Sequence, residues 1–403
     1  MQFVEAFIPY GGYWSTPFSR WQGSFAHLHS MTFAADITRR ALEERHLEAS
    51  AFDALHLGLT VPQPHSFYGA PWLAGMIGAQ GITGPTLSQA CATSARVLAS
   101  AAMAVDTDEA ETVLTITCDR TSNGPHLYYP NPLGPGGRGD AEDWVWDNFS
   151  FDPYAKNAMI ETAENVAEEG EISREEQDRV TLMRYEQYQK ALADDSAFLR
   201  RFMVAPLEVR DTAGRKVVAT VTGDEGVFPT TQDGLARLKP VKEGGTVTFG
   251  SQTHPADGNC GLIVTRAEKA REMSRDPGIE VQLLSFGQAR AKAGFMAQAT
   301  VPAARRALEA AGLTLDEMKA IKTHNPFAVN DIYFCRETGV PAEALNNYGC
   351  SLIWGHPQGP TGMRLVMELI EELVIKGGGY GLFTGCAAGD TAAAVVLRVT
   401  EAG

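Results

Sequence analysis

The sequence lacks a long apolar run, a closely spaced cysteine pair and an excess of basic residues. No stretch of about 18 or more uncharged apolar residues occurs, so we expect no transmembrane helix. Residues 1–7 contain no basic region followed by an apolar run, and they favour a first strand over a signal peptide. We therefore expect a chain that does not bind to or cross a membrane.

The six cysteines form no C-x-x-C pair. Disulfide frameworks are typical of small secreted chains, whereas this chain has 403 residues. We therefore expect reduced thiols, a cytoplasmic protein and no metal site within the chain, and at least one thiol is available for chemistry. The cysteines are Cys91, Cys118, Cys260, Cys335, Cys350 and Cys386.

Lysine and arginine number 34 against 49 acidic residues, which gives a formal net charge of -15. This balance argues against nucleic acid or an anionic membrane surface as a partner. It does not exclude an anionic ligand, because a helix N-terminus binds phosphate even on an acidic protein. The length predicts two or three domains.

Strand-like and helix-like segments alternate, which indicates a layered α/β core. Residues 54–59 and 112–118 read as buried strands, and a helix rich in small residues over 92–104 lies between them. Residues 119–245 break this alternation with many Pro, Gly and aromatic residues, and we interpret them as an inserted loop domain.

The second half repeats the order of the first, which suggests a duplicated fold. Residues 361–375 read as a long helix, and 380–384 and 392–399 read as paired core strands. Three capping boxes predict helix starts, each a Ser or Thr followed three residues later by Glu. They are Ser173-x-x-Glu176, Thr265-x-x-Glu268 and Thr314-x-x-Glu317.

Cys91 lies at a turn directly before the small-residue helix. Free backbone N–H groups at a helix N-terminus stabilise negative charge, so this position favours the thiolate, which is the nucleophilic form. The alternative is a buried structural cysteine, the commoner fate of a free cysteine.

Three further segments combine reactive and small residues. His356 lies in a Gly/Pro turn over 355–362, where it is either a base that activates a thiol or a turn residue that only bonds backbone. Cys386 ends an apolar strand within a run of small residues, where backbone N–H groups can face an oxyanion or simply form a tight turn. His324 begins the segment His-Asn-Pro-Phe, which polarises a carbonyl or merely starts a loop.

Taken together, these segments resemble the thiolase family. The resemblance rests on the Cys91 segment, the Gly-His-Pro-x-Gly-x-x-Gly turn at 355–362, the end of the Cys386 strand and the run over 162–178. The motifs follow the family's order and spacing over nearly the whole chain.

The resemblance implies a five-layered α-β-α-β-α duplication with an inserted loop domain. The N-terminal half would comprise residues 1–118 and 246–268, and the C-terminal half 269–403. Residues 119–245 would form the loop domain that holds the acyl and coenzyme A pocket.

The resemblance also implies roles for individual residues. Cys91 would take the acyl group, His356 would remove its proton, and Cys386 would exchange a proton at the carbon alpha to the thioester carbonyl. Backbone N–H groups of Cys91 and Ala388 would form one oxyanion hole, and His324 and His356 would bind the other oxygen.

Departures from the family pattern concern the substrate pocket. Many thiolases have Asn-Glu-Ala-Phe where this chain has His324-Asn325-Pro326-Phe327, and their loop histidine aligns here with Ala158. Substrate and coenzyme A contacts are expected from Met159, Thr253, Asn325 and Phe327. The aromatic loop region admits a bulky or aromatic acyl group, such as that of benzoylsuccinyl-CoA.

The expected activity is cleavage of a 3-oxoacyl-CoA by coenzyme A, or the reverse Claisen condensation, with coenzyme A as substrate and no bound cofactor. The alternatives are a decarboxylating ketoacyl synthase, which Cys386 disfavours, and a thiolase-like scaffold subunit without catalysis. The resemblance implies a homodimer or homotetramer, and a benzoylsuccinyl-CoA-type enzyme would add a small zinc-ribbon/OB-fold partner subunit.

Overall fold

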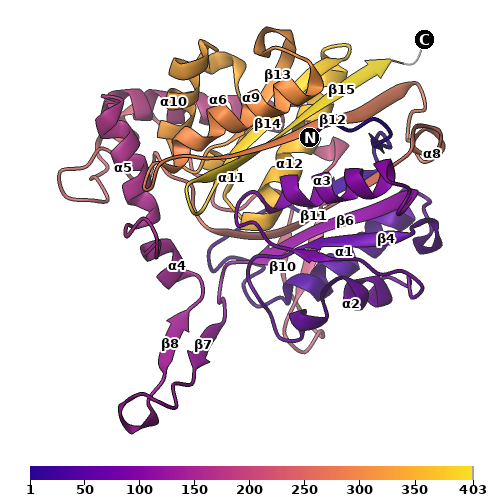
Figure 1. Cartoon of the computed structure of the whole chain (residues 1–403), viewed down its shortest axis with the longest axis horizontal. Coiled ribbons are helices and arrows are strands. Elements are labelled where there is room, and N and C mark those ends of the chain that lie inside the picture. Colours follow the sequence, from indigo (N-terminus) through magenta and orange to yellow (C-terminus); the bar gives the residue numbers. More distant parts are fainter. Residues whose placement is uncertain (402–403) are drawn as a thin grey trace.

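The computed structural model describes residues 1–401 and is built around one large mixed sheet (Figure 1). Its strands follow the order β13-β14-β15-β12-β1-β11-β6-β4-β5. They are β1 (Phe7–Ile8), β4 (Ala54–Gly58), β5 (Thr86–Leu87), β6 (Thr112–Arg120), β11 (Ala256–Thr265), β12 (Ile279–Arg290), β13 (Met318–His324), β14 (Gly379–Ala387) and β15 (Thr391–Glu401). Two short strands, β2 (Tyr13–Ser15) and β3 (Ser19–Arg20), also pair with β11.

Two half-sheets meet at the two-residue strand β1, where Phe7 pairs with both Thr265 of β11 and Gln282 of β12. Helices α3 (Thr93–Asp106) and α12 (Gln358–Ile375) lie between the halves and contact each other and strands of both. Almost every side chain of α12 is buried, as a helix enclosed by two sheets requires.

Outer helices complete the layers. Helices α1 (Ser30–Glu44) and α2 (Gly69–Met76) contact strands of the first half, and α9 (Thr300–Ala311) covers the second. The predicted five-layered α-β-α-β-α arrangement is therefore confirmed (Figure 1).

Residues 119–245 carry the irregular elements. A hairpin of β7 (His126–Tyr129) and β8 (Asp140–Asp143) projects from the body of the protein (Figure 1). The other elements are α4 (Trp146–Ser150), α5 (Met159–Glu169), α6 (Arg174–Ser196), α7 (Gln232–Ala236), and the hairpin of β9 (Leu207–Arg210) and β10 (Val217–Val221).

Two buried ion pairs join this region to the C-terminal half. Arg184 of α6 donates to Asp331 of α10 (Ala328–Thr338) over 2.8 Å, and Arg364 of α12 donates to Asp224 over 2.7 Å. Loss of one partner from such a pair typically destabilises a protein by about 3–5 kcal/mol. The loop region is therefore fixed firmly beside the C-terminal half.

Two of the three predicted capping boxes are confirmed. Ser173 and Glu176 cap α6, and Thr314 and Glu317 cap the short 3-10 helix η6 (Leu315–Glu317). The box at Thr265 is wrong, because that residue ends β11 and Arg266 is the N-cap of α8 (Ala267–Glu272) without a side-chain bond. Strand pairing with β6 holds the Thr265 backbone and overrides the local signal.

No helix within residues 1–401 is both long and apolar enough to span a membrane.

Candidate active site

Segments that are far apart in the sequence meet at one edge of the C-terminal half-sheet. Strands β13 and β14 are parallel, and His324 pairs in register with Gly385, so His324 and Cys386 lie at the same edge. His356, in the turn between α11 (Ser351–Trp354) and α12, forms a bridge with Pro255. Its ring contacts Cys91, which lies just before α3. The structure brings Cys91, His324 and His356 together, with Cys386 near Cys91.

Cys91 and His356 form the central pair, with 3.2 Å between the Cys91 Sγ and the His356 Nε2. On the other side of the ring, Nδ1 lies 2.7 Å from the Thr361 hydroxyl, which itself donates to the Pro357 carbonyl. Because that hydroxyl proton is already used, His356 donates from Nδ1, and its Nε2 lone pair faces the thiol.

The Cys91–His356 pair is neutral at rest. Burial raises the pKa of the Cys91 thiol to about 12, and burial, aided by the nearby His254, lowers the pKa of His356 to about 3. The sequence favoured a resting thiolate. The structure differs because α3 begins only at Thr93 and burial outweighs the nearby N–H donors. Nucleophilic attack therefore requires His356 to take the thiol proton.

Two backbone N–H groups lie against the Cys91 sulfur. They belong to Ala388 and to Cys91 itself, and both favour the thiolate. Each sits in a tight turn, since Ala90 has a φ of 45° and Gly389 a φ of 78°. Left-handed backbone at a residue other than glycine costs on the order of 1–3 kcal/mol, so the turn at Ala90 is held by its surroundings.

His324 lies beside His356, with ring centroids 4.1 Å apart. It is fully buried, and burial lowers its pKa well below the usual value, so the ring is neutral. Its Nδ1 lies 2.8 Å from the Ser351 hydroxyl, while its Nε2 has no protein partner within residues 1–401.

Ser351 determines which nitrogen of His324 carries the proton. The Ser351 oxygen accepts the N–H of Asn325, and the single hydroxyl proton has two acceptors in reach, His324 Nδ1 at 2.8 Å and the Asn325 side-chain oxygen at 3.2 Å. We assign the proton to His324 Nδ1 because that contact is the shorter one. That tautomer leaves an N–H on Nε2, as an oxyanion-hole donor requires.

Asn325 was expected to contact substrate, but the protein uses both ends of its amide. Its nitrogen donates to Asp331 over 2.7 Å and lies 3.2 Å from the Cys350 sulfur. Its oxygen accepts the Ser351 hydroxyl and the Leu352 N–H, each over 3.2 Å. The side chain is fully buried. In this structure it supports the turn that carries His324.

Cys386 has a partner that the sequence did not reveal. The Asn330 side-chain nitrogen donates to the Cys386 sulfur over 3.1 Å. Burial raises the pKa of Cys386 well above its usual value, the neighbouring Cys91 raises it further, and the Asn330 bond lowers it. Asn330 lies 56 residues away in the chain, and no local pattern pairs it with a cysteine.

A groove of 490 Å³ opens between the loop region and the segment that precedes β11. Its lining includes Leu235, Phe249, Gln252, His254 and Leu352. The backbone of its His254 accepts a hydrogen bond from the N–H of His356, so the groove adjoins the catalytic histidine.

None of the remaining predicted substrate residues, Met159, Thr253 and Phe327, lines this groove. Thr253 follows the lining residue Gln252, and its hydroxyl donates to the Ser351 carbonyl over 2.5 Å. Phe327 forms a bridge with Gln252 and is almost fully buried. Met159 is the first residue of α5 and packs against the main core. Thr253 and Phe327 therefore shape the wall behind the groove.

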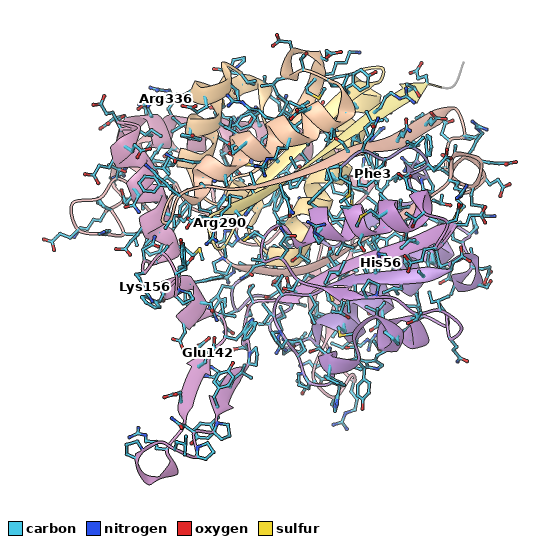
Figure 2. All side chains as sticks on the ribbon, in the orientation of Figure 1. Phe3, His56, Glu142, Lys156, Arg290 and Arg336 are labelled. Carbon is cyan, nitrogen blue, oxygen red and sulfur yellow. The ribbon has the colours of Figure 1, made fainter. Side chains whose placement is uncertain are left out.

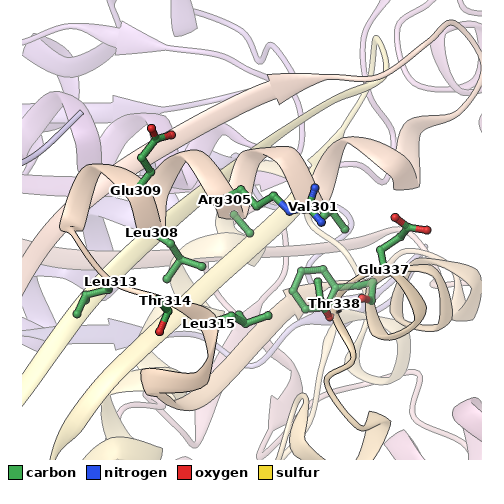
Figure 3. Close-up of a pocket in the computed structure, with 11 residues that line it drawn as sticks. Val301, Arg305, Leu308, Glu309, Leu313, Thr314, Leu315, Glu337 and Thr338 are labelled. Carbon is green, nitrogen blue, oxygen red and sulfur yellow. Dashed lines mark hydrogen bonds between the residues drawn. The ribbon is translucent and has the colours of Figure 1, made fainter.

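A second hollow, of 320 Å³, lies on the outer side of the C-terminal half between α9, η6 and α10 (Figure 3). Aliphatic side chains and Phe334 form its floor, with charged Arg305, Glu309 and Glu337 around it. Its lining contains no cysteine or histidine.

Cys91, His324 and His356 offer ligand atoms within 4.8 Å of one another, and they are the one such group within residues 1–401. The sequence predicted no metal site from cysteine spacing, and spacing alone could not reveal a group formed by three distant segments.

Comparison with known proteins matches nearly the whole chain. The thiolase N-terminal domain model matches residues 13–268, and the thiolase C-terminal domain model matches residues 278–399. An acetyl-CoA acetyltransferase of Pseudomonas aeruginosa is 28% identical over 95% of this chain and 96% of its own length. A 3-oxoadipyl-CoA/3-oxo-5,6-dehydrosuberyl-CoA thiolase of Escherichia coli is 28% identical over 98% of this chain and 99% of its own length.

Solved structures agree. Human mitochondrial 3-ketoacyl-CoA thiolase superposes with a TM-score of 0.89 at 25% identity and covers 98% of this chain and 99% of its own. A second structure of that enzyme, in complex with CoA, has a TM-score of 0.88. The fold and these relatives define an acyltransferase. The chain belongs to the thiolase family.

Proposed function

We propose that this protein is a catalytically active thiolase that cleaves a 3-oxoacyl-CoA with coenzyme A, or runs the reverse Claisen condensation, through an acyl group on Cys91. The 3.2 Å contact between the Cys91 thiol and the unprotonated Nε2 of His356 is the observation that supports it most directly. Coenzyme A is the substrate, and the groove beside His254 is where we place its pantetheine arm.

In the first step, the Cys91 sulfur attacks the 3-oxo carbon while His356 accepts the thiol proton. The tetrahedral oxyanion then lies beside the N–H groups of Cys91 and Ala388, which already reach the sulfur. Its collapse breaks the bond between carbons 2 and 3 and leaves the acyl group on Cys91. The electron pair moves onto the departing thioester as an enolate.

In the second step, Cys386 protonates carbon 2 of that enolate, whose oxygen lies near the Nε2 atoms of His324 and His356. After the protonated thioester leaves, coenzyme A gives its thiol proton to the Cys386 thiolate and attacks the acyl-Cys91 carbonyl. Collapse of this second tetrahedral intermediate releases the shortened acyl-CoA, and the departing Cys91 thiolate takes back the proton that His356 holds. The Asn330 bond to Cys386 supports this assignment over a decarboxylating synthase, since it stabilises the thiolate left after proton donation.

The candidate acyl groups are short, bulky or aromatic. Tyr128 and Leu133, on the projecting hairpin, are 60% and 97% exposed and lie outside any enclosed acyl pocket of the single chain. Trp144 is less exposed and bonds the Thr60 carbonyl. A benzoylsuccinyl-type substrate therefore has fewer aromatic neighbours here than the sequence alone suggested.

A cleavage assay over a panel of 3-oxoacyl-CoA esters, aliphatic and aromatic, tests the proposed function. We expect coenzyme A-dependent loss of at least one ester and a mass adduct on Cys91 with the matching acyl-CoA. Turnover of malonyl thioesters alone would establish the synthase instead. No adduct with any acyl-CoA would establish a scaffold subunit.

We also propose a homodimer or homotetramer in the cytoplasm. The exposed apolar side chains Phe67 and Leu133 support association of subunits, and the six free cysteines support a reducing compartment. The benzoylsuccinyl-type alternative adds a small zinc-ribbon/OB-fold subunit. Native mass spectrometry of the protein purified from its source distinguishes these assemblies.

Replacing His324 by alanine should lower kcat about 100-fold, because one donor to an enolate oxygen typically contributes on the order of 100- to 1000-fold. The Ser351→Ala variant should lower kcat less, about tenfold. It keeps the His324 imidazole and removes only the hydroxyl that selects its tautomer. Steady-state kinetics of both variants check this. Equal activity of His324→Ala and the wild type would remove His324 from the oxyanion hole.

A further inference from the structure

Arg290 ends its strand at the catalytic edge of the C-terminal half. Strands β12 and β14 both run antiparallel to β15, so they are parallel to each other, and β13 is parallel to β14. Their last residues, Arg290, His324 and Ala387, therefore lie at one edge of the sheet. Thr391 pairs with both Arg290 and Ala387, which places those two residues two strand spacings apart, about 10 Å.

The guanidinium of Arg290 is held next to the catalytic turn. Its Nε donates to the Gly389 carbonyl over 3.1 Å, and Gly389 directly follows the oxyanion donor Ala388. On the other side, Tyr154 of the loop region packs against it, with 4.7 Å from the Arg290 Cζ to the ring centroid. Figure 2 labels Arg290 and Lys156, which is two residues beyond Tyr154, in the same part of the molecule.

The charge of Arg290 has no direct partner. No carboxylate within residues 1–401 lies within 4.0 Å of it, and its two terminal nitrogens make no hydrogen bond there. The side chain is exposed. An arginine held at Nε and by an aromatic ring, with both terminal nitrogens free, presents the two-pronged donor that binds a carboxylate.

The nearby acidic group Asp390 and its neighbour Asp152 accept hydrogen bonds from backbone N–H groups. Asp390 accepts the N–H of Gly294 over 2.8 Å, and Asp152 accepts the N–H groups of Tyr154 and Ala155. Both carboxylates are thus turned toward the chain, and neither neutralises Arg290 by contact.

We propose that Arg290 binds a carboxylate at the far end of the acyl group, so that the preferred substrates are CoA thioesters of 3-oxo dicarboxylic acids. The inference rests on the proposed function, because it requires the acyl group to be carried on Cys91. A short acyl chain and an extended arginine side chain together span the distance from the catalytic turn to the end of β12. The thioester end is fixed by the oxyanion donors and the carboxylate end by Arg290.

The test compares two six-carbon substrates that differ only at the far end, 3-oxoadipyl-CoA with a carboxylate and 3-oxohexanoyl-CoA with a methyl group. Wild-type protein should prefer the diacid in kcat/KM. Arg290→Gln removes the Nε bond to Gly389 for both esters, but only the diacid also loses a charge-assisted pair, so kcat/KM should fall about 100-fold more for the diacid than for the neutral ester.

Arg306→Gln is the matched control. Arg306 is an exposed arginine of α9 that donates to the Gln288 carbonyl on the same strand, and its loss should leave both substrates unchanged. Equal kcat/KM of Arg290→Gln and wild type with the diacid would overturn the proposal. So would an equal loss with both esters through a raised KM for coenzyme A, which would assign Arg290 to a coenzyme A phosphate.

Failure of the proposed function looks different. In that case the wild-type protein turns over neither ester and forms no adduct on Cys91 with succinyl-CoA or butyryl-CoA, whatever residue stands at 290. Circular dichroism melting of each variant confirms that the fold is intact before the kinetics are compared.

Discussion

Replacing Cys91 by alanine should lower thiolase turnover by at least about 10⁵-fold while the protein stays folded. The proposed reaction passes through a covalent acyl group, and no other thiol lies against both His356 and the N–H of Ala388 in residues 1–401. Loss of a nucleophile that acts as a unit with its base abolishes nearly all the chemical contribution. Turnover of the best ester of the panel, and the intact mass after incubation with its acyl-CoA, measure the effect.

Cys335→Ala is the matched control for this variant. Cys335 is also a free, half-buried thiol, but it lies on α10 away from the catalytic histidines. Its loss should leave both turnover and the adduct intact. Turnover of Cys91→Ala within about tenfold of the wild type, or an adduct that maps to Cys335, would contradict acyl transfer through Cys91.

The sequence predicts the architecture well because the core segments carry strong patterns. The buried strand expected over 112–118 extends over Thr112–Arg120, and the helix expected over 361–375 starts at Gln358. Length and flanking turn residues separate the two kinds of buried segment, since short apolar runs are strands and long ones are helices. The first strand expected over residues 1–7 is only Phe7–Ile8. This short strand pairs with β11 on one side and β12 on the other, where the two half-sheets meet.

The sequence also indicates the reactive residues, but not what sets their protonation. Cys91, His356 and Cys386 stand out because reactive side chains lie among glycines and other small residues. Their partners Thr361, Ser351 and Asn330 are ordinary polar residues whose roles arise from tertiary contacts. The resting thiol of Cys91 follows from burial, and burial is a property of the fold rather than of the local segment.

The buried polar network behind His324 explains how the site stays rigid. Asp331 accepts from Arg184 of the loop region, from Asn325 and from the hydroxyl of Thr323. One carboxylate thereby joins the loop region, the end of β13 and the first turns of α10. The same helix presents Asn330 to Cys386. The network therefore orients both the donor to Cys386 and the turn that carries His324.

Replacing Cys386 by serine should lower turnover by on the order of 10³- to 10⁴-fold, because a hydroxyl is a far weaker acid than a thiol and its alkoxide does not form at neutral pH, and a positioned acid–base group contributes about 10²- to 10⁴-fold. Acylation of Cys91 should persist, since Cys91 and His356 are untouched. Exchange of the alpha protons of acetyl-CoA with deuterated water should be lost. Mass spectrometry follows the adduct, and NMR follows the exchange.

The Asn330→Ala variant is a milder change at the same thiol. Without the donated N–H, the pKa of Cys386 rises further above its usual value, so its thiolate forms less readily at a given pH. The exchange rate at neutral pH should fall about tenfold and recover as the pH is raised, whereas Cys386→Ser shows no recovery. Loss of the adduct together with exchange in Cys386→Ser would mean that the second thiol supports the first, and the division of labour between the two sulfurs would then be wrong.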